Sequence, residues 1–216
     1  MPSRRLLLLA APAAVAAFAL AGCSLADDGP RTTQTRDVVT FTRIDNRDSV
    51  DLRLHVGEAQ RVKVRAGEKV IDDVRTEVHN GTLEVTFDHD GLLGSDVVVD
   101  ASVPRLTGID VSGSGDVDAD GIDAGAFALR SDGSADIALR GTVGRLAVDV
   151  TGSGDADLSD LAARDARVAV EGSGDTEVRA DRSLDVAVDG SGDVRYHGDP
   201  ALTRQVDGSG ELRHAR

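Results

Sequence analysis

Aromatic side chains and cysteine are almost absent from this sequence. Only 2% of the 216 residues are aromatic, Trp is missing and there is one Cys. A pocket for a small molecule usually draws on several aromatic side chains, so that class of site is disfavoured. A single Cys cannot form a disulfide within the chain, so the fold must be stable without one.

Basic residues are also in deficit. The chain has 24 Lys and Arg against 38 Asp and Glu, which gives a net charge of -14, and no basic stripe interrupts this excess. A phosphate backbone would be repelled, so no binding to nucleic acid is expected. Hydrophobic residues still make up 40% of the chain, which distinguishes it from a disordered acidic tail.

Residues 1–22 predict a signal peptide. A basic start precedes an apolar run at residues 6–20, which is interrupted by Pro12 and too short to span a bilayer. The run ends in LAGC, which resembles a bacterial lipobox, the motif whose Cys is acylated after cleavage before it. We therefore expect Cys23 to carry palmitate and related chains and to anchor an exported protein to the cell membrane or envelope, because several acyl chains give stable attachment. A secretory signal followed by a chance Cys is the alternative.

The remaining chain divides by its pattern. Residues 23–36 are polar and aperiodic, and we expect them to form the lipidated Cys and a flexible tether. Residues 37–216 predict a single domain. Within it, residues 37–108 form an irregular β part, and residues 109–216 are repetitive.

The repetitive part is organised by the motif Gly-Ser-Gly-Asp and close variants. Its six copies begin 18 to 20 residues apart, a regularity that indicates one structural unit repeated. One copy departs from the pattern, with Ala135 in place of the second Gly. The acidic residues that end the copies are Asp116, Asp136, Asp155, Asp175, Asp193 and Glu211.

Apolar residues alternate with acidic or polar residues on both sides of each motif, as at Val148 and Val150. This period of two places them on one face of a strand. We expect two short strands in each interval, with a variable loop between them. The expected loops lie at residues 120–123, 142–145, 163–165, 181–183 and 199–200. One such coil cannot bury its apolar face, whereas coils stacked about 4.8 Å apart share a continuous core. The sequence therefore predicts an all-β parallel β-solenoid, or β-helix, with 18 to 20 residues per coil.

Residues 37–108 are β-rich but less regular. The sequence His79-Asn80-Gly81 predicts a type I′ hairpin, because Asn-Gly tolerates positive φ at both central positions. We expect antiparallel hairpins in this part, capping the first edge of the solenoid. The expected strands lie at residues 38–44, 50–56, 61–64, 74–78, 82–87 and 97–103.

The order of these segments resembles a bacterial family described as putative auto-transporter adhesin, head GIN domain. The resemblance covers residues 37–212, and the Gly-Ser-Gly-Asp periodicity is its most specific part. It implies an envelope-associated β-helical domain and transfers no catalytic residue. The segments that carry it are residues 41–44, 81–85, 104–109 and 111–116 with the later copies of the motif.

Stacked coils would place the six acidic residues in a ladder, with neighbours near 5 Å apart. Two like charges at that distance cost about 0.8 kcal/mol in water and about 3 kcal/mol at an effective dielectric of 20. Hydrogen bonds from free N–H groups of the turn can offset this cost, which makes each acid a turn cap. Nearby Arg can also offset this cost. Bound cations are the remaining alternative, and they would make the ladder a calcium site. Apart from calcium, no cofactor is expected.

Evidence for catalysis is weak. The five His are scattered without metal-ligand spacing, and the loops are too short to wall a groove. The acidic turn at residues 88–91 could ligate a metal, although a solvated turn explains it as well. We therefore expect a non-enzymatic, lipid-anchored module for adhesion, interaction or structural support, with an unknown protein or glycan as partner. A calcium-dependent binding module and a polysaccharide-active β-helix enzyme are the alternatives left open.

Overall fold

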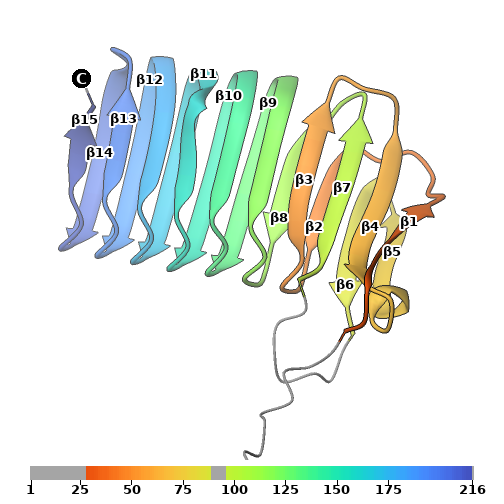
Figure 1. The fold of residues 1–216 in the computed structure, drawn as a ribbon. Coiled ribbons are helices and arrows are strands. Elements are labelled where there is room, and N and C mark those ends of the chain that lie inside the picture. Colours follow the sequence, from red (N-terminus) through yellow and green to blue (C-terminus); the bar gives the residue numbers. More distant parts are fainter. Residues whose placement is uncertain (1–27, 89–95, 216) are drawn as a thin grey trace, which may run out of the picture.

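The computed structural model describes residues 28–88 and 96–215, and it shows a solenoid of stacked β coils that closes in antiparallel strands at its N-terminal end (Figure 1). The strands of neighbouring repeat coils pair in parallel. The predicted parallel β-solenoid is confirmed. Its repeat coils are formed by the strands β9 (Val117–Gly133), β10 (Ile137–Gly152), β11 (Ala156–Gly172), β12 (Thr176–Gly190), β13 (Val194–His197), β14 (Ala201–Gly208) and β15 (Leu212–His214).

The alternating apolar residues face inward, as predicted. Val148 pairs with Val168 in the next coil and Val168 pairs with Val186, so side chains of one type stack in register. Each of the three is 1% exposed. Aliphatic side chains fill most of the narrow interior, which explains how a chain so poor in aromatics has a continuous core.

The expectation of two strands and a loop in each interval is wrong for most coils. Strands β9 to β12 each run without interruption from one corner to the next, and differences in coil length appear as register shifts, such as the one between Leu139 and Gly141. Ile122 and Val143, which were expected in loops, point inward and are buried. An inward apolar side chain and pairing on both sides keep these segments in the ladder. Only residues 199–200, between β13 and β14, form the expected loop.

The N-terminal part combines early coils with a cap. Strands β2 (Arg43–Asn46), β3 (Asp51–Val56) and β8 (Gly108–Val111) pair in parallel with other strands of the solenoid. Strand β4 (Arg61–Gly67) is antiparallel to β7 (Val98–Val103), which itself pairs in parallel with β3. The cap that was predicted from the hairpin pattern is therefore present.

A hairpin forms the second half of the cap. Strand β5 (Val74–His79) follows a 3-10 turn at Ile71–Asp73 and pairs antiparallel with β6 (Thr82–Phe87). Between the two strands, Asn80 has φ of 51° and Gly81 has φ of 78°. Positive φ at both positions is what a type I′ turn requires, so this prediction is confirmed.

Two expectations about the first residues of the domain are corrected. Within the expected tether, Arg31–Arg36 forms β1, which pairs antiparallel with β4. Its residues are Arg, Thr and Gln, so a search for apolar alternation does not detect this edge strand. The strand expected at residues 38–44 is confined to β2. Before it, the Gln60 side chain donates to the carbonyls of Val38 and Val39, both at 3.1 Å, in place of strand pairing.

Within residues 28–88 and 96–215, no antiparallel strand covers the C-terminal end of the solenoid. Strand β14 pairs with β12, and every one of its residues is exposed. Leu202 and Val206 are 39% and 37% exposed, although their register places them in line with buried residues of the coil before. Arg204 pairs with Val186 and occupies the inward position between them.

Candidate functional site

Each corner of the solenoid depends on its first Gly. Gly152, Gly172 and Gly190 have φ of 121°, 135° and 141°, in the region that favours Gly. A Cβ at Gly172 would lie 2.1 Å from the carbonyl oxygen of Gly152 in the coil before. Conformation and space therefore both demand Gly at the first position of the motif in every copy after the first, whereas at Gly113 only the space does.

At the second Gly of the motif, glycine is favoured only because a Cβ has no room. A Cβ at Gly154 or Gly174 would lie within 2.1 Å of a backbone oxygen of the preceding coil, yet neither residue has a positive φ. Ala135 stands at this position in one copy and is 1% exposed, so that corner accommodates a Cβ that the corners at Gly154 and Gly174 do not.

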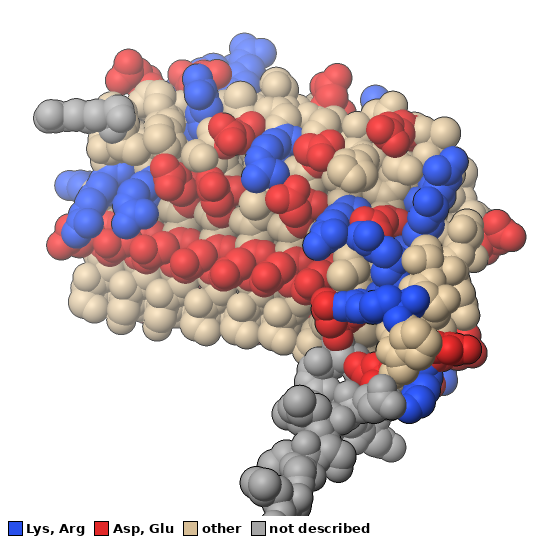
Figure 2. Space-filling model, viewed as in Figure 1, with Lys and Arg blue, Asp and Glu red and all other residues tan. Residues whose placement is uncertain are grey.

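The structure brings the six predicted acidic residues together in one ladder. In each step, the backbone N–H of one acidic residue donates to Oδ1 of the acidic residue in the coil before, at 2.8 to 3.1 Å. The same bond joins Asp116 to Asp51 at 3.1 Å, so the ladder begins one coil earlier than the sequence analysis placed it. Figure 2 shows acidic side chains in a continuous row across the coils.

These bonds refine the expected role of the acids. We expected each carboxylate to cap free N–H groups of its own turn, whereas it caps the N–H at the start of the next coil. A carboxylate that accepts a backbone N–H gains a charge-assisted hydrogen bond. Each bond therefore offsets part of the repulsion along the row and fixes the spacing of adjacent corners.

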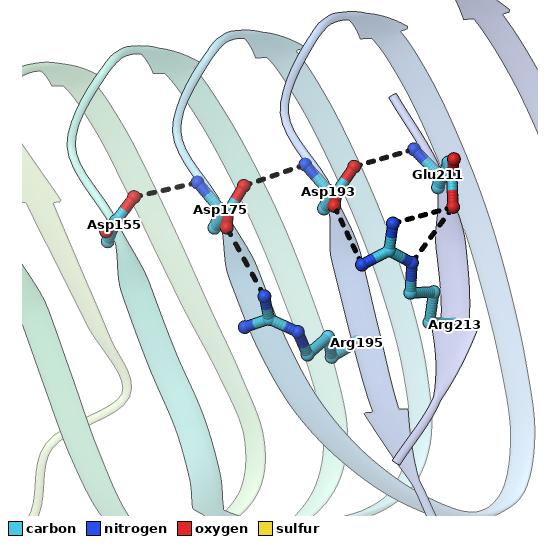
Figure 3. Close-up of polar contacts among 6 residues, drawn as sticks. All are labelled: Asp155, Asp175, Asp193, Arg195, Glu211 and Arg213. Atoms are coloured by element: carbon cyan, nitrogen blue, oxygen red, sulfur yellow. Dashed lines mark hydrogen bonds and ion pairs between the residues drawn. The ribbon is translucent and has the colours of Figure 1, made fainter. Parts of the chain in front are cut away.

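Two arginines complete the C-terminal end of the ladder (Figure 3). Arg195 lies 3.7 Å from Asp175, and Arg213 lies 3.6 Å from Asp193 and 2.8 Å from Glu211. Among the described residues, none forms an ion pair with Asp116, Asp136 or Asp155. Within the described part of the chain, arginine therefore pairs with the ladder only toward its C-terminal end.

Calcium binding by the ladder stays a prediction. Within residues 28–88 and 96–215, no group of three or more acidic, His or Cys side chains is arranged to hold a metal ion. One oxygen of each Asp in the ladder is already taken by a backbone N–H, and the second oxygen would have to serve a cation. A thermal melt with calcium and then with chelator separates the two roles, since a ligand at 100 times its dissociation constant adds about 2.7 kcal/mol.

Other predicted site residues fall outside this row. Cys23 and most of the acidic turn at residues 88–91 lie outside the described part of the chain. Three of the His pair with single acids, as His55 does with Asp120 at 2.8 Å. His214 stacks on Tyr196 with ring centroids 4.8 Å apart. Among the described residues, no helix is long and apolar enough to cross a membrane.

A hollow that was not predicted from the sequence lies on another outer face of the coils. It has a volume of about 960 Å³ and is lined by Ala side chains and by four arginines, Arg43, Arg105, Arg145 and Arg167. Because residues 142–145 were expected to form a loop, Arg145 could not be placed beside Arg167. The only signal in the sequence was a cluster of Ala at positions where other coils carry charged residues.

Solved structures share this architecture. A putative adhesin from Bacteroides fragilis aligns with a TM-score of 0.69 and 21% identity, over 86% of this chain and 97% of that one. A putative lipid binding protein from Parabacteroides distasonis aligns with a TM-score of 0.50 and 23% identity, over 87% of this chain and 98% of that one. At these identities the likeness shows the fold alone. None of the curated proteins is significantly similar to this chain.

The sequence pattern of one family matches residues 40–200, which include the cap strands β4 to β6, the early coils and the corners up to Gly190-Ser191-Gly192-Asp193. This match spans most of the chain and contains five of the six copies of the motif that builds the ladder. The chain therefore belongs to the family described as putative auto-transporter adhesin, head GIN domain.

Proposed function

We propose that the chain is an exported, lipid-anchored adhesion module that acts without catalysis. The observation that carries this proposal is its membership of an adhesin family over residues 40–200, on a fold shared with a putative adhesin. A rigid stack of coils suits this role because it offers a long outer face whose side chains are held in register. Its corners are four-residue turns rather than long loops that could wall a catalytic groove.

An anchor at Cys23 would orient the solenoid. Seven residues lie between Cys23 and Arg31, where β1 begins, and the eight Cα-to-Cα steps reach about 28 Å when fully extended. The cap would then lie near the membrane, and the repeat coils would extend away from it toward a partner. The first strand also makes the free tether shorter than the sequence analysis expected.

Replacement of Cys23 with Ser tests the anchor. We expect Cys23→Ser to move the protein from the membrane fraction to the soluble fraction and to abolish labelling by an alkyne analogue of palmitate. Matched replacement of Ser24 with Ala should change neither readout. Unchanged fractionation of Cys23→Ser would overturn the lipid anchor.

Adhesion is tested with whole cells. Cells that carry the chain should adhere more strongly to immobilised glycans or host proteins than cells from which it is deleted. Equal adhesion of the two strains would contradict the proposal. The enzyme alternative predicts turnover of a polysaccharide panel by the purified chain, and detection of shortened products would replace the adhesive role with a catalytic one.

A further inference from the structure

The 960 Å³ hollow is a basic groove in an acidic molecule. Its floor consists of Ala126, Ala128 and Ala147, outward-facing residues of β9 and β10. Ala128 and Ala147 pair directly in the register of these two strands, so their short side chains leave adjacent outer positions empty. The hollow is therefore built into the coil surface and does not depend on a loop. We call it the basic groove, comprising this floor with Arg43, Arg105, Arg145 and Arg167.

Three arginines of the basic groove have free guanidinium groups. Arg105, Arg145 and Arg167 are exposed, and none forms an ion pair with any residue of the described ranges. By contrast, Arg130 lies 3.7 Å from Asp149 and Arg140 lies 3.0 Å from Asp118, and neither arginine lines the groove. In a chain with 38 acidic and 24 basic residues, three unpaired arginines beside one hollow constitute a local reversal of charge.

The fourth arginine is held in place. Nη2 of Arg43 lies 2.7 Å from Oδ2 of Asp110. Gly108 lies beneath the guanidinium, and a Cβ at that position would come within 2.6 Å of Nη1. The absence of a side chain at Gly108 therefore lets Arg43 lie against the strand, with its orientation fixed before any ligand arrives.

The one acidic residue that lines the basic groove is already occupied. Asp165 accepts hydrogen bonds from both Nε and Nη2 of Arg182, and Ser183 donates to it at 2.6 Å. The Arg182 guanidinium, with help from Ser183, holds the pKa of Asp165 below its ordinary value. Asp165 is therefore bonded to Arg182 and does not neutralise Arg145 or Arg167.

We propose that the basic groove binds an acidic glycan, a sugar chain that bears carboxylate or sulfate groups. The proposal rests on the adhesive function and supplies its ligand class. Arginine suits this ligand because its planar fork binds an oxyanion through two parallel hydrogen bonds. The volume of the groove falls within the range of ordinary ligand sites.

Other ligand classes fit less well. Neutral sugars rely on stacking against exposed rings, and the one aromatic residue that lines the groove, Phe127, is 2% exposed. Contact with a membrane surface favours exposed large apolar side chains. Among the described residues those are Val39, Leu202 and Val206, and none of them lines the groove. A long polyanion such as DNA would be repelled by the net charge of -14.

The test is calorimetric titration of the full chain in detergent with three acidic hexasaccharides, which are oligogalacturonate, oligomannuronate and a heparin fragment. Fully methyl-esterified oligogalacturonate serves as the matched neutral ligand. At least one acidic hexasaccharide should bind, and when it is oligogalacturonate its ester should bind at least 20-fold more weakly. The double variant Arg145→Ala/Arg167→Ala should lose about 20-fold or more in affinity, because each residue can supply a charged hydrogen bond.

A second double variant controls for net charge. Arg61→Ala/Arg179→Ala removes two exposed arginines outside the groove and should change affinity less than about 3-fold. The proposal is overturned if no acidic hexasaccharide binds, if the ester binds as well as the acid, or if both double variants lose affinity equally. Binding of phosphatidylglycerol vesicles without binding of any hexasaccharide also overturns it.

The adhesion assay separates this proposal from the proposed function. If cells with Arg145→Ala/Arg167→Ala adhere as well as wild-type cells, and both exceed the deletion strain, the adhesive function stands and the basic groove is not its site. If the groove binds an acidic hexasaccharide but the deletion strain adheres normally, the site stands and the adhesive function fails.

Discussion

The two ends of the solenoid terminate the same column of side chains in opposite ways. The column contains one inward residue from each successive coil. Its members between the two ends are Ile44, Ile109, Leu129, Val148, Val168 and Val186. It begins at Leu83, which is 0% exposed beneath β5 and the rest of the cap. It ends at Arg204, which is exposed in β14. One end is covered by antiparallel strands, and the other carries a charge where the preceding coils place Val, Leu or Ile.

This difference shows two solutions to the problem of an open edge. A strand edge with unpaired N–H and C=O groups invites pairing with another chain, and native proteins prevent this by covering the edge or by placing inward charges on it. The cap performs the first task with β1, β4 and β5. Arg204 performs the second, because a second solenoid stacked on β14 would have to bury its guanidinium.

The largest expected effect comes from placing a charge in the column at its covered end. Leu83→Asp should cost more than about 4 kcal/mol in the free energy of unfolding, because the carboxylate would be buried without a partner. Val206→Asp, at the open end, should cost less than about 1 kcal/mol, since Val206 is 37% exposed. Urea unfolding followed by circular dichroism measures both. Similar losses would show that the two ends are equally buried.

Substitution of a corner glycine should have the next largest effect on stability. Gly172→Ala should cost about 2 to 4 kcal/mol, because it combines positive φ with a Cβ 2.1 Å from the oxygen of Gly152. Gly57→Ala, in the N-terminal part, has φ of 99° but no atom within 4 Å of its Cβ, so it should cost only about 1 kcal/mol. Melting temperatures of the two variants would show whether the clash with the neighbouring coil adds to the cost of placing Ala at a positive φ. Equal shifts would mean that the backbone conformation alone accounts for the destabilisation and that the clash contributes nothing.

The ladder should show a smaller contrast between its interior and its end. Asp155→Ala removes the acceptor of the Asp175 N–H and should cost about 1 kcal/mol, whereas Asp155→Asn keeps an acceptor and should cost less than half of that. Glu211→Ala should be nearly neutral, because the Glu211 carboxylate contacts only the exposed Arg213 side chain among the described residues. Chemical denaturation of all three variants is the measurement. A loss in Asp155→Asn as large as in Asp155→Ala would mean that the negative charge itself is needed.

The smallest effect on stability is expected from Arg204→Val at the open end. The change continues the Val column to its last coil and should leave the melting temperature within about 2 °C, because β14 is exposed throughout. Self-association should increase, and sedimentation velocity would detect it as dimers. Arg179→Ala, which removes an exposed charge away from the end, should stay monomeric if the wild-type chain does. No dimer in either variant would show that Arg204 is not what keeps the ends apart.

Much of the fold was predictable because its signals are local. Val148 and Val168 occur with a period of two, and a strand buries alternate residues wherever it lies. The turn at Asn80 and Gly81 is equally local. Strand β1 was not predictable because an edge strand needs no apolar face. The continuity of β9 to β12 was not predictable either, because a bend with an inward Ile122 resembles a polar loop in sequence.

The candidate sites were also predictable only in part. The acidic row was visible from spacing alone, since equal intervals along the chain become neighbouring positions in a stack. The partner of each acid was not visible, because the N–H that it accepts belongs to the next coil. Arg105 and Arg145 are 40 positions apart in the chain, and only the folded coils place both at one hollow.

By itself, the sequence determined the solenoid, the length of its coils, the inward column and the positions of the corners, because period, glycine and alternation act within a few residues. The tertiary structure decided which acid receives which N–H, how each end is closed and where unpaired arginines meet over Ala128 and Ala147. Those features depend on contacts between coils, and such contacts are set by the register of the stack rather than by neighbours in the chain.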